Sequence, residues 1–331
     1  MKRHNPDISY LYNPDYIHKP VLWREIVDMV EGYLKKGAGH FADCTLGEGG
    51  HSEILLKLFP EMKITGFERD SAILERAKER LARFGGRVKF VNSNFSDIGR
   101  EFGPGNRPDY ILYDFGISSW HFEESGRGFA FARNEPLDMR LDRGGINAGE
   151  VVNTWSEKEL SRIFRVYGEE KWAARIALVI CERRLRAAIE TTGQLASIVM
   201  AAIPRKFHVR NVHPATRVFQ ALRIEVNAEL ASIEKGLAAG FGVLAEGGVM
   251  MAISFHSLED RIVKNFSRRM KHGCLCGLEP QRCLCRNGAF AEVLTKKPVL
   301  PQTDEIAWNS RSRSAKLRAL VKLKEIPADG L

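Results

Sequence analysis

The sequence predicts a Rossmann-like α/β fold, in which a parallel sheet is interrupted by an inserted helical domain. Two observations support this prediction. Strand and helix patterns alternate through the first third of the chain, and an apolar strand pattern returns at 248–255 after a long helical stretch. Such alternation favours a parallel sheet with helices on both faces. The 331 residues are enough for one large domain or two, and a hydrophobic content of 44% is ordinary for a globular protein.

The first part of the sheet is predicted from short apolar segments separated by amphipathic ones. Strands are expected at 40–45, 63–68, 88–91 and 109–113. Helices are expected at 51–59 and 71–84, because the second of these places Ile73, Leu74, Ala77 and Leu81 on one face. The first part of the sheet domain therefore spans 1–117.

The alternation of strand and helix patterns stops in the middle of the chain. Residues 118–149 are polar and contain glycines, and helices are predicted at 156–167, 169–188 and 192–203. We interpret 118–212 as a helical insertion that recognises the substrate, and 213–331 as the second part of the sheet domain with a basic C-terminal segment.

The closing part contains a helix, a strand, a second helix and a last segment. The helix is predicted over 213–227 and the strand within 248–255. A capping box formed by Ser257 and Asp260 is expected to open a helix at 257–270. Apolar and basic residues alternate over 315–323, which suits a strand with one wet face, although a helix is the alternative.

The charge balance favours a polyanionic partner. The chain has 50 Lys and Arg residues against 41 Asp and Glu, a formal net charge of +9. The excess gathers at 261–286 and 296–324, where a solvated basic surface is an equally good interpretation. No apolar run predicts a membrane span, and the N-terminus lacks the apolar region of a secretory signal, so we expect a cytoplasmic protein.

A glycine-rich turn follows the first predicted strand. It matches the dinucleotide fingerprint at Gly47 and Gly49, but Ser52 stands where the third glycine belongs. Glu68 follows the second strand, where a carboxylate can accept hydrogen bonds from ribose hydroxyls. These features fit a dinucleotide or S-adenosylmethionine, since both contain adenosine. A glycine turn without a ligand is the third possibility.

Asp114 ends the fourth predicted strand, in the stretch Asp114-Phe-Gly-Ile-Ser-Ser119. Ligands of open parallel sheets bind beyond the carboxyl ends of the strands, near the point where the winding reverses. Asp114 is therefore expected beside any ligand held by the glycine turn, and a helix N-cap is the alternative role.

Further polar stretches include 127–131, 136–140 and 213–227. Thr216, Gln220, Arg223 and Asn227 form a stripe at helical spacing whose side chains suit nucleobases and phosphates. His256 follows the strand at 248–255 and is equally compatible with packing and with ligand contact. Four thiols could bind a metal, although their spacing is tighter than usual and a reduced loop is the alternative; they are Cys274, Cys276, Cys283 and Cys285. We assign no metal.

Together, the motifs resemble the bacterial 16S rRNA (cytosine-N4)-methyltransferase family. The matching stretches cover nearly the whole chain in order: 18–22, 45–52, 114–119, 127–131, 137–141, 213–223, 253–264 and 310–318. The resemblance implies a class I S-adenosylmethionine-dependent methyltransferase sheet with an inserted helical domain. It also implies N4-methylation of a cytidine in the decoding centre of 16S rRNA, with the small ribosomal subunit as partner.

The resemblance also implies which residues bind the cofactor, S-adenosyl-L-methionine. They are Gly49, Gly50, His51, Glu68, Phe95, Asp114 and His121. The family usually has Asp at the position of Glu68, which keeps the carboxylate. It usually has Pro-Gln where this chain has Trp120-His121, so His121 is carried over only weakly.

A cytosine amine is a poor nucleophile because its lone pair is delocalised, so a hydrogen-bond acceptor near it should assist the transfer. We expect Asp114 or the Phe115 carbonyl to serve, with Ser118 and Ser119 as secondary candidates. The target base must leave its stack, and Trp120, Phe129 and Phe131 are candidate stacking surfaces. The expected substrate contacts also include Arg127, Arg140, Arg217, Gln220 and Arg223.

Two rival functions share part of this evidence. A dinucleotide-dependent oxidoreductase would use the same glycine turn and Glu68, but Ser52 and the Asp114 stretch count against it. A nonenzymatic rRNA-binding assembly factor could be built on the same fold.

Overall fold

The computed structural model describes residues 19–33, 39–131, 133–142, 144–208, 213–273 and 287–326. The chain forms two compact units, a sheet unit of residues 1–117 and 232–331 and a helical unit of residues 118–231. We describe each unit by itself. No helix in the described ranges has both the length and the apolar character needed to cross a membrane.

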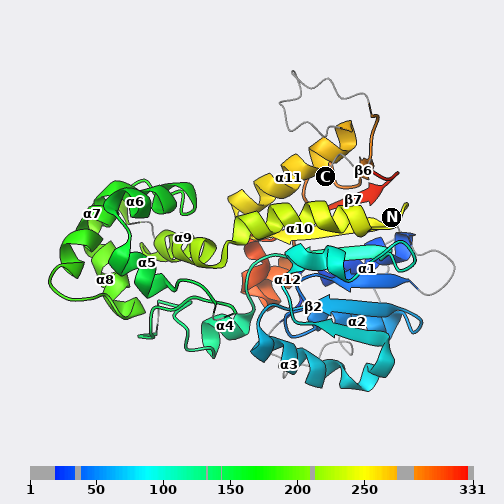
Figure 1. Cartoon of the computed structure of the whole chain (residues 1–331), viewed down its shortest axis with the longest axis horizontal. Helices are drawn as coiled ribbons and strands as arrows, with labels where there is room; N and C mark the ends of the chain where they lie inside the picture. Colours follow the sequence, from blue (N-terminus) through cyan, green and yellow to red (C-terminus); the bar gives the residue numbers. More distant parts are fainter. Residues whose placement is uncertain are drawn as a thin grey trace. The chain divides into compact units, whose positions relative to one another are not determined.

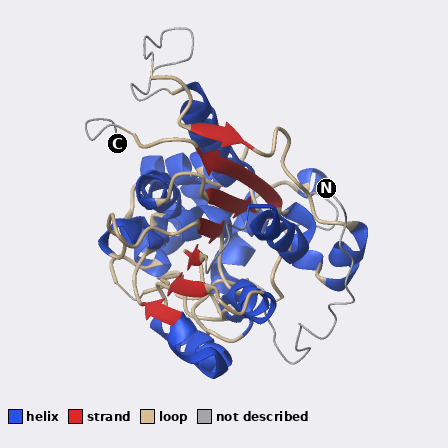
Figure 2. Ribbon diagram, turned by 90° about the vertical axis from the view of Figure 1, so that its right-hand side faces the viewer, coloured by secondary structure: helices blue, strands red, loops and turns tan. Residues whose placement is uncertain are grey.

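The sheet unit confirms the predicted parallel sheet. Its strands within the described residues are β1 (His40–Asp43), β2 (Lys63–Phe67), β3 (Val88–Val91), β4 (Tyr110–Asp114), β5 (Val249–Ser254), β6 (Ala291–Val293) and β7 (Lys316–Lys322). Their order in the sheet is β3-β2-β1-β4-β5-β7-β6. Figure 2 draws the strands in red, one beside the next. Strands β1 to β5 run parallel, whereas β7 pairs antiparallel with both β5 and β6. The last segment is therefore a strand and not the alternative helix.

Helices cover this sheet (Figure 1). They are α1 (Trp23–Tyr33), α2 (Gly50–Leu58), α3 (Ser71–Leu81), α10 (Glu229–Val243, most of which lies in this unit), α11 (Ser257–His272) and α12 (Thr303–Trp308). Helix α2 packs on β2 and α3 on β3, while α1 packs on β5 and α11 on β5 and β7. The sequence patterns predicted α2, α3 and α11, but α1, α10, α12 and β6 were not predicted.

The central strands are buried on both faces, as expected for a parallel sheet. In β4, Tyr110 to Tyr113 are all buried, and every residue of β5 is buried. One face packs Leu112, Met251 and Leu317 against Ile26 and Val30 of α1. This core fixes the strands, so the loops at their carboxyl ends start from defined positions.

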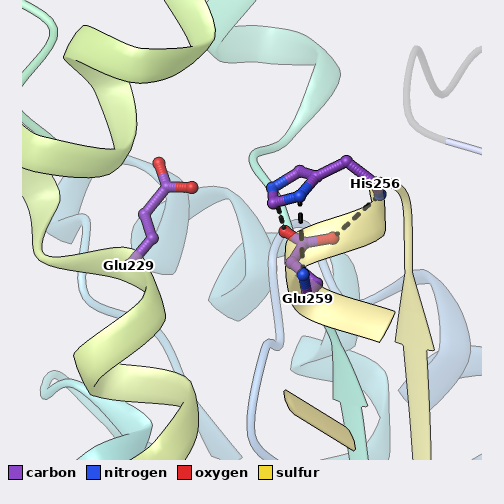
Figure 3. Close-up of side chains that lie close together, drawn as sticks. All are labelled: Glu229, His256 and Glu259. Atoms are coloured by element: carbon purple, nitrogen blue, oxygen red, sulfur yellow. Dashed lines mark hydrogen bonds and ion pairs between the residues drawn. The ribbon is translucent and has the colours of Figure 1, made fainter. Parts of the chain in front are cut away.

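The start of α11 corrects one sequence prediction. The capping box is formed by His256 and Glu259, one residue earlier than predicted (Figure 3). The Glu259 carboxylate accepts hydrogen bonds from the backbone N–H groups of Phe255, at 2.7 Å, and His256, at 3.3 Å. Asp260 instead pairs with Arg318 of β7 through contacts of 2.7 and 3.2 Å. The pairs His256–Glu259 and Ser257–Asp260 both have the capping-box spacing. Because β5 ends at Ser254, the helix begins early enough for His256 to be its N-cap.

The helical unit contains α4 (Ser119–Glu123), α5 (Ala148–Thr154), α6 (Glu157–Val166), α7 (Ala173–Arg184), α8 (Thr192–Ala202) and α9 (Thr216–Asn227) (Figure 1). Capping boxes begin three of these helices, at Asn147, Ser156 and Thr191. Helix α6 packs on α7 and α9, and α5 also packs on α9. The unit therefore extends to Ala231 and includes α9, beyond the end at 212 expected from the sequence.

Candidate active site

The carboxyl ends of β1, β2, β4 and β5 lie at one edge of the sheet, because these four strands are parallel neighbours. They present Asp43, Glu68, Asp114 and His256 there. The chain order reverses at β1, whose neighbours are β2 and β4, and such a point is where open α/β sheets bind ligands. We take this edge as the candidate active site.

The glycine turn after β1 contains two residues with left-handed backbone, Gly47 (φ +52°) and Gly49 (φ +81°). Packing also requires Gly49, because a Cβ there would lie 2.9 Å from Cδ1 of Leu81. Among the described residues, a Cβ at Gly47 would come within 4 Å of only the Thr45 carbonyl, at 3.9 Å. Gly47 thus has open space above it, while Gly49 is covered. A Cβ at Gly50 would lie 3.3 Å from Pro20, so packing restricts that position too.

Glu68 ties the end of β2 to the glycine turn. One carboxylate oxygen accepts from the Gly47 N–H at 3.0 Å and the other from the Asp70 N–H at 2.8 Å. Burial raises the pKa of Glu68 to about 7, although these two hydrogen bonds act in the opposite direction. A carboxylate offers about four acceptor positions, so Glu68 retains acceptor capacity for hydroxyl groups of a ligand.

Asp43 is a site residue that sequence reasoning did not select. It is buried at the end of β1, and the Ser52 hydroxyl donates to its Oδ2 at 2.6 Å. Burial raises the pKa of Asp43 to about 6. The available signal was a carboxylate inside an apolar strand. Ser52, which breaks the dinucleotide fingerprint, has a defined partner in this carboxylate.

Asp114 and His51 face each other across the edge of the sheet. The His51 ring lies with Nε2 2.8 Å from the Val21 carbonyl and Nδ1 3.8 Å from Oδ2 of Asp114. Burial lowers the pKa of His51 to about 4, so the ring is neutral near pH 7. Burial, together with the negative charges of Asp43, Glu259 and Glu305, holds the pKa of Asp114 well above its usual range.

The Oδ1 atom of Asp114 is buried and has no hydrogen-bond partner among the described residues. The alternative role of Asp114 as a helix N-cap is wrong, because Ser118 caps α4. A buried acceptor without a partner is costly unless a ligand or water satisfies it. Asp114 therefore has the property expected of a ligand-binding side chain.

Phe95 lies in an aromatic cluster of the sheet unit. Its ring centroid is 5.5 Å from that of Tyr113 and 5.9 Å from that of Phe115. Gly236 of α10 leaves room for this ring, since a Cβ there would lie 2.5 Å from Phe95. Phe95 is partly exposed, so one part of its ring is available to a ligand.

The predicted residues at the start of the helical unit are largely buried. Ser118 accepts a hydrogen bond from the Trp120 N–H at 3.3 Å, and the buried His121 ring lies 5.2 Å from the buried Phe129 ring. Arg127 is also buried, donates to the Leu141 carbonyl at 3.0 Å and lies over Trp120. These contacts hold the loop after α4 together.

Most of the polar stripe on α9 also bonds within the helical unit. Arg223 forms a two-pronged ion pair with Glu229, at 2.8 and 2.9 Å, and Gln220 donates to the Tyr167 carbonyl. Asn227 accepts from the Leu141 N–H at 3.0 Å and donates to the Met139 carbonyl at 2.8 Å. Within the stripe, Asn227 thus anchors the segment 139–141, a role that the sequence pattern did not reveal.

Two predicted arginine contacts differ in their surroundings. Arg140 pairs with Asp138 at 2.7 and 3.1 Å, whereas Arg217 is exposed and donates to the Glu169 carbonyl. Phe131 stacks on His213 with centroids 4.4 Å apart. Among the basic residues near the C-terminus, Arg311 and Arg313 are exposed. The four cysteines of the proposed metal alternative lie outside the described residues.

Comparisons with known proteins show which family the chain resembles. The model of the MraW methylase family matches residues 15–323. Ribosomal RNA small subunit methyltransferase H of Symbiobacterium thermophilum is 45% identical over 312 residues, covering 93% of this chain and 97% of the relative. The protein of the same name from Geobacter sulfurreducens is 46% identical over 314 residues, covering 93% and 99%. A solved putative rRNA methylase from Clostridium thermocellum aligns with a TM-score of 0.43 at 9% identity, covering 91% of this chain and 96% of that one.

Proposed function

Because the chain belongs to the MraW methylase family, we propose that it transfers a methyl group from S-adenosylmethionine to N4 of a cytidine in the decoding centre of 16S rRNA. The chain is a methyltransferase by family, and its class I methyltransferase fold is the one predicted. The names of its relatives support small-subunit rRNA as the substrate. The motif resemblance supports the N4 position and the decoding centre.

The observation that carries the proposal is the unsatisfied Oδ1 of Asp114 at the carboxyl end of β4. S-adenosylmethionine, when bound, supplies a methyl group already activated on a sulfonium. When ionised, the carboxyl groups of Asp43, Glu68 and Asp114 would give this edge of the sheet a field that favours a cationic ligand. Gly47 leaves open space beside them. The residues present therefore fit this cofactor.

We assign the remaining acceptor capacity of Glu68 to the ribose hydroxyls and the exposed part of Phe95 to the apolar part of the cofactor. The predicted contacts from Gly49, Gly50 and His51 stay part of the proposal, with one refinement. Gly49 and Gly50 shape the turn by packing, so backbone groups, rather than space above them, would contact the ligand. His121 remains a proposed cofactor contact that rests on the motif resemblance alone, and this resemblance is weak at Trp120-His121.

Asp114 is the proposed acceptor for the cytosine amine. Its raised pKa makes it a better proton acceptor, once ionised, than an ordinary aspartate. Ser118 remains the second candidate, although its hydroxyl oxygen already accepts from the first turn of α4. The Phe115 carbonyl remains the backbone alternative.

For the RNA, we propose a division of roles among the predicted contacts. Arg217 is exposed and can bind phosphate directly. Arg127, Phe129, Arg140, Gln220 and Arg223 are buried or engaged within the helical unit, so they would act by shaping the loops that meet the substrate. The net charge of +9 should add affinity that decreases with salt.

The direct test is transfer of labelled methyl to small ribosomal subunits that lack the modification, followed by nucleoside analysis. Label in N4-methylcytidine supports the proposal, and label only in another nucleoside contradicts it. Calorimetry with NADH and with S-adenosylmethionine separates the oxidoreductase rival. Tight binding of subunits without any methyl transfer would favour the nonenzymatic assembly factor.

A further inference from the structure

The peptide group between Val21 and Leu22 connects the candidate active site to the C-terminal helix α12. Its carbonyl lies 2.8 Å from Nε2 of His51, and its N–H donates to Oε1 of Glu305 at 2.8 Å. All four residues are at least nine-tenths buried. Because Nδ1 of the same histidine faces Asp114, a continuous path of polar contacts runs from Glu305 to Asp114.

The backbone at this peptide is strained. Leu22 has φ +54°, a left-handed conformation that is unfavourable for a residue with a Cβ. Rotating the peptide plane by about half a turn would move Leu22 to an allowed negative φ. That rotation would also turn the Val21 carbonyl away from His51 and break both hydrogen bonds. The observed orientation is therefore held by its two partners, His51 on one side and Glu305 on the other.

The orientation of this peptide determines which nitrogen of His51 carries the proton. A carbonyl can only accept a hydrogen bond, so the neutral ring must bear its proton on Nε2. Nδ1 then presents a lone pair to Asp114. A lone pair can accept a proton from a carboxylic acid, but it repels a carboxylate. The opposite tautomer, with the proton on Nδ1, would favour the ionised form of Asp114.

The charged surroundings act in the same direction. Asp43 of β1, Glu259 of α11 and Glu305 of α12 all raise the pKa of Asp114, and Arg80 of α3 lowers the pKa of His51. Burial raises the pKa of Glu305. The negative charges of Glu25 and Asp304 raise this pKa further, and the positive charge of Arg24 lowers it. The described residues around Asp114 thus supply carboxyl groups and a neutral imidazole, with no cation in contact with its carboxyl oxygens.

We propose that Glu305 is a positioning residue of the cofactor site. By holding the Val21–Leu22 peptide it keeps His51 in the Nε2–H tautomer, and so keeps a proton on Asp114 until a cationic ligand binds. On binding, Asp114 releases that proton to solvent and becomes the carboxylate that pairs with the cation. The identity of the cation, S-adenosylmethionine, rests on the proposed function, whereas the tautomer and its dependence on Glu305 do not.

Three variants separate this role from a general stabilising role of α12. Glu305→Gln keeps an oxygen that can accept from the Leu22 N–H but removes the charge. Glu305→Ala removes the acceptor. Asp304→Asn is the matched control, because Asp304 is on the same helix and pairs with Arg24 of α1 at 2.6 Å without touching the 21–22 peptide. Thermal unfolding of each variant checks that it is folded.

The first measurement reads the tautomer in the free protein. Two-bond ¹H–¹⁵N spectra of protein labelled at histidine nitrogen, with His51 assigned from the His51→Asn variant, report which nitrogen is protonated. We expect Nε2–H in the wild type, in E305Q and in D304N, and a population of Nδ1–H in E305A. An Nδ1–H wild type, which needs no variant to detect, would overturn the proposal. So would an E305A spectrum identical to that of the wild type, an E305Q spectrum like that of E305A, or a D304N spectrum that shifts.

The second measurement is proton release on binding S-adenosylmethionine at pH 7, from calorimetry in buffers of different ionisation enthalpy. Release should fall in E305A by up to roughly one proton per cofactor and stay unchanged in D304N. It should fall less in E305Q, which loses the charge of Glu305 but keeps the acceptor for the Leu22 N–H. Equal release in E305A and wild type would contradict the proposal. If the wild type bound no S-adenosylmethionine, the proposed function would fail, while the tautomer measurement would still decide the role of Glu305.

Discussion

The two units use polar side chains in opposite ways. At the carboxyl edge of the sheet, Asp114 has an oxygen with no partner among the described residues, and Glu68 retains acceptor capacity. On α9 of the helical unit, Gln220, Arg223 and Asn227 are engaged in contacts within their own unit. In this chain, a polar residue at a strand end of the parallel sheet is therefore a stronger sign of ligand binding than the polar stripe on α9.

The largest expected effect of breaking this contrast is at Asp114. Replacing Asp114 by Asn keeps the shape but removes the proton acceptor, so methyl transfer should fall by about a thousandfold. Single-turnover transfer to unmodified subunits measures this. Asp138→Asn, which removes the partner of Arg140 in the helical unit, is the comparison variant and should retain at least a tenth of the rate. Equal losses in the two variants would remove the distinction between the units.

In the helical unit, Asn227→Ala should lower the stability of the unit and weaken its affinity for the substrate. It leaves the half-buried Leu141 N–H and the buried Met139 carbonyl without their side-chain partner, so the unfolding free energy of this unit should fall by about 2 kcal/mol. Denaturant unfolding and proteolysis of the loop around 139–141 test this. Affinity for S-adenosylmethionine should not change. A weaker cofactor affinity in the variant would show that the contacts of Asn227 with Leu141 and Met139 also support the cofactor site.

The sheet-edge carboxyl groups predict a pH dependence of cofactor binding. Burial raises the pKa of Asp43 to about 6 and that of Glu68 to about 7. A cationic ligand prefers their ionised forms, so affinity should increase as the pH rises from about 5 to 8. Below the pKa of each group the increase is about tenfold per pH unit for each proton that must be lost. Calorimetric titrations across this range measure it. An affinity that decreases over the same range would contradict the assigned charge complementarity.

The smallest expected effect is at Arg217. Removing this exposed charge by Arg217→Gln should weaken subunit binding by a few-fold and lower the slope of log affinity against log salt by about 1. Arg186→Gln removes the same charge from another exposed position of the helical unit and serves as the control. If the two variants weakened binding equally, Arg217 would contribute only to net charge.

The sequence predicted those parts of the fold that local periodicity determines. The strands β1 to β5 and β7 and the helices α2, α3 and α11 lie within a few residues of their predicted bounds. The carboxyl edge with Gly47, Glu68 and Asp114 followed from the strand ends and the topology of parallel sheets. Short elements such as α12 and β6 were not predicted, because segments of three to six residues are too short to show a periodic pattern.

The remaining features depend on contacts between residues far apart in the chain. Glu305 reaches the Leu22 N–H across 283 positions, and Asn227 reaches Leu141 across 86. No local pattern encodes such pairings. The same limit applies to Asn227 in the α9 stripe, since its partners lie in the 139–141 loop, which has no periodic pattern. The sequence showed which groups can form hydrogen bonds, and the structure showed which of these are already bonded.

The central claim is that the carboxyl edge of the sheet, with Asp114, is where a cytidine N4 of small-subunit rRNA is methylated. The most direct measurement is nucleoside analysis of unmodified small subunits after incubation with labelled S-adenosylmethionine and either the wild type or Asp114→Asn. We expect label in N4-methylcytidine with the wild type and almost none with the folded, subunit-binding variant. Label in a different nucleoside, or full labelling by the variant, would contradict it.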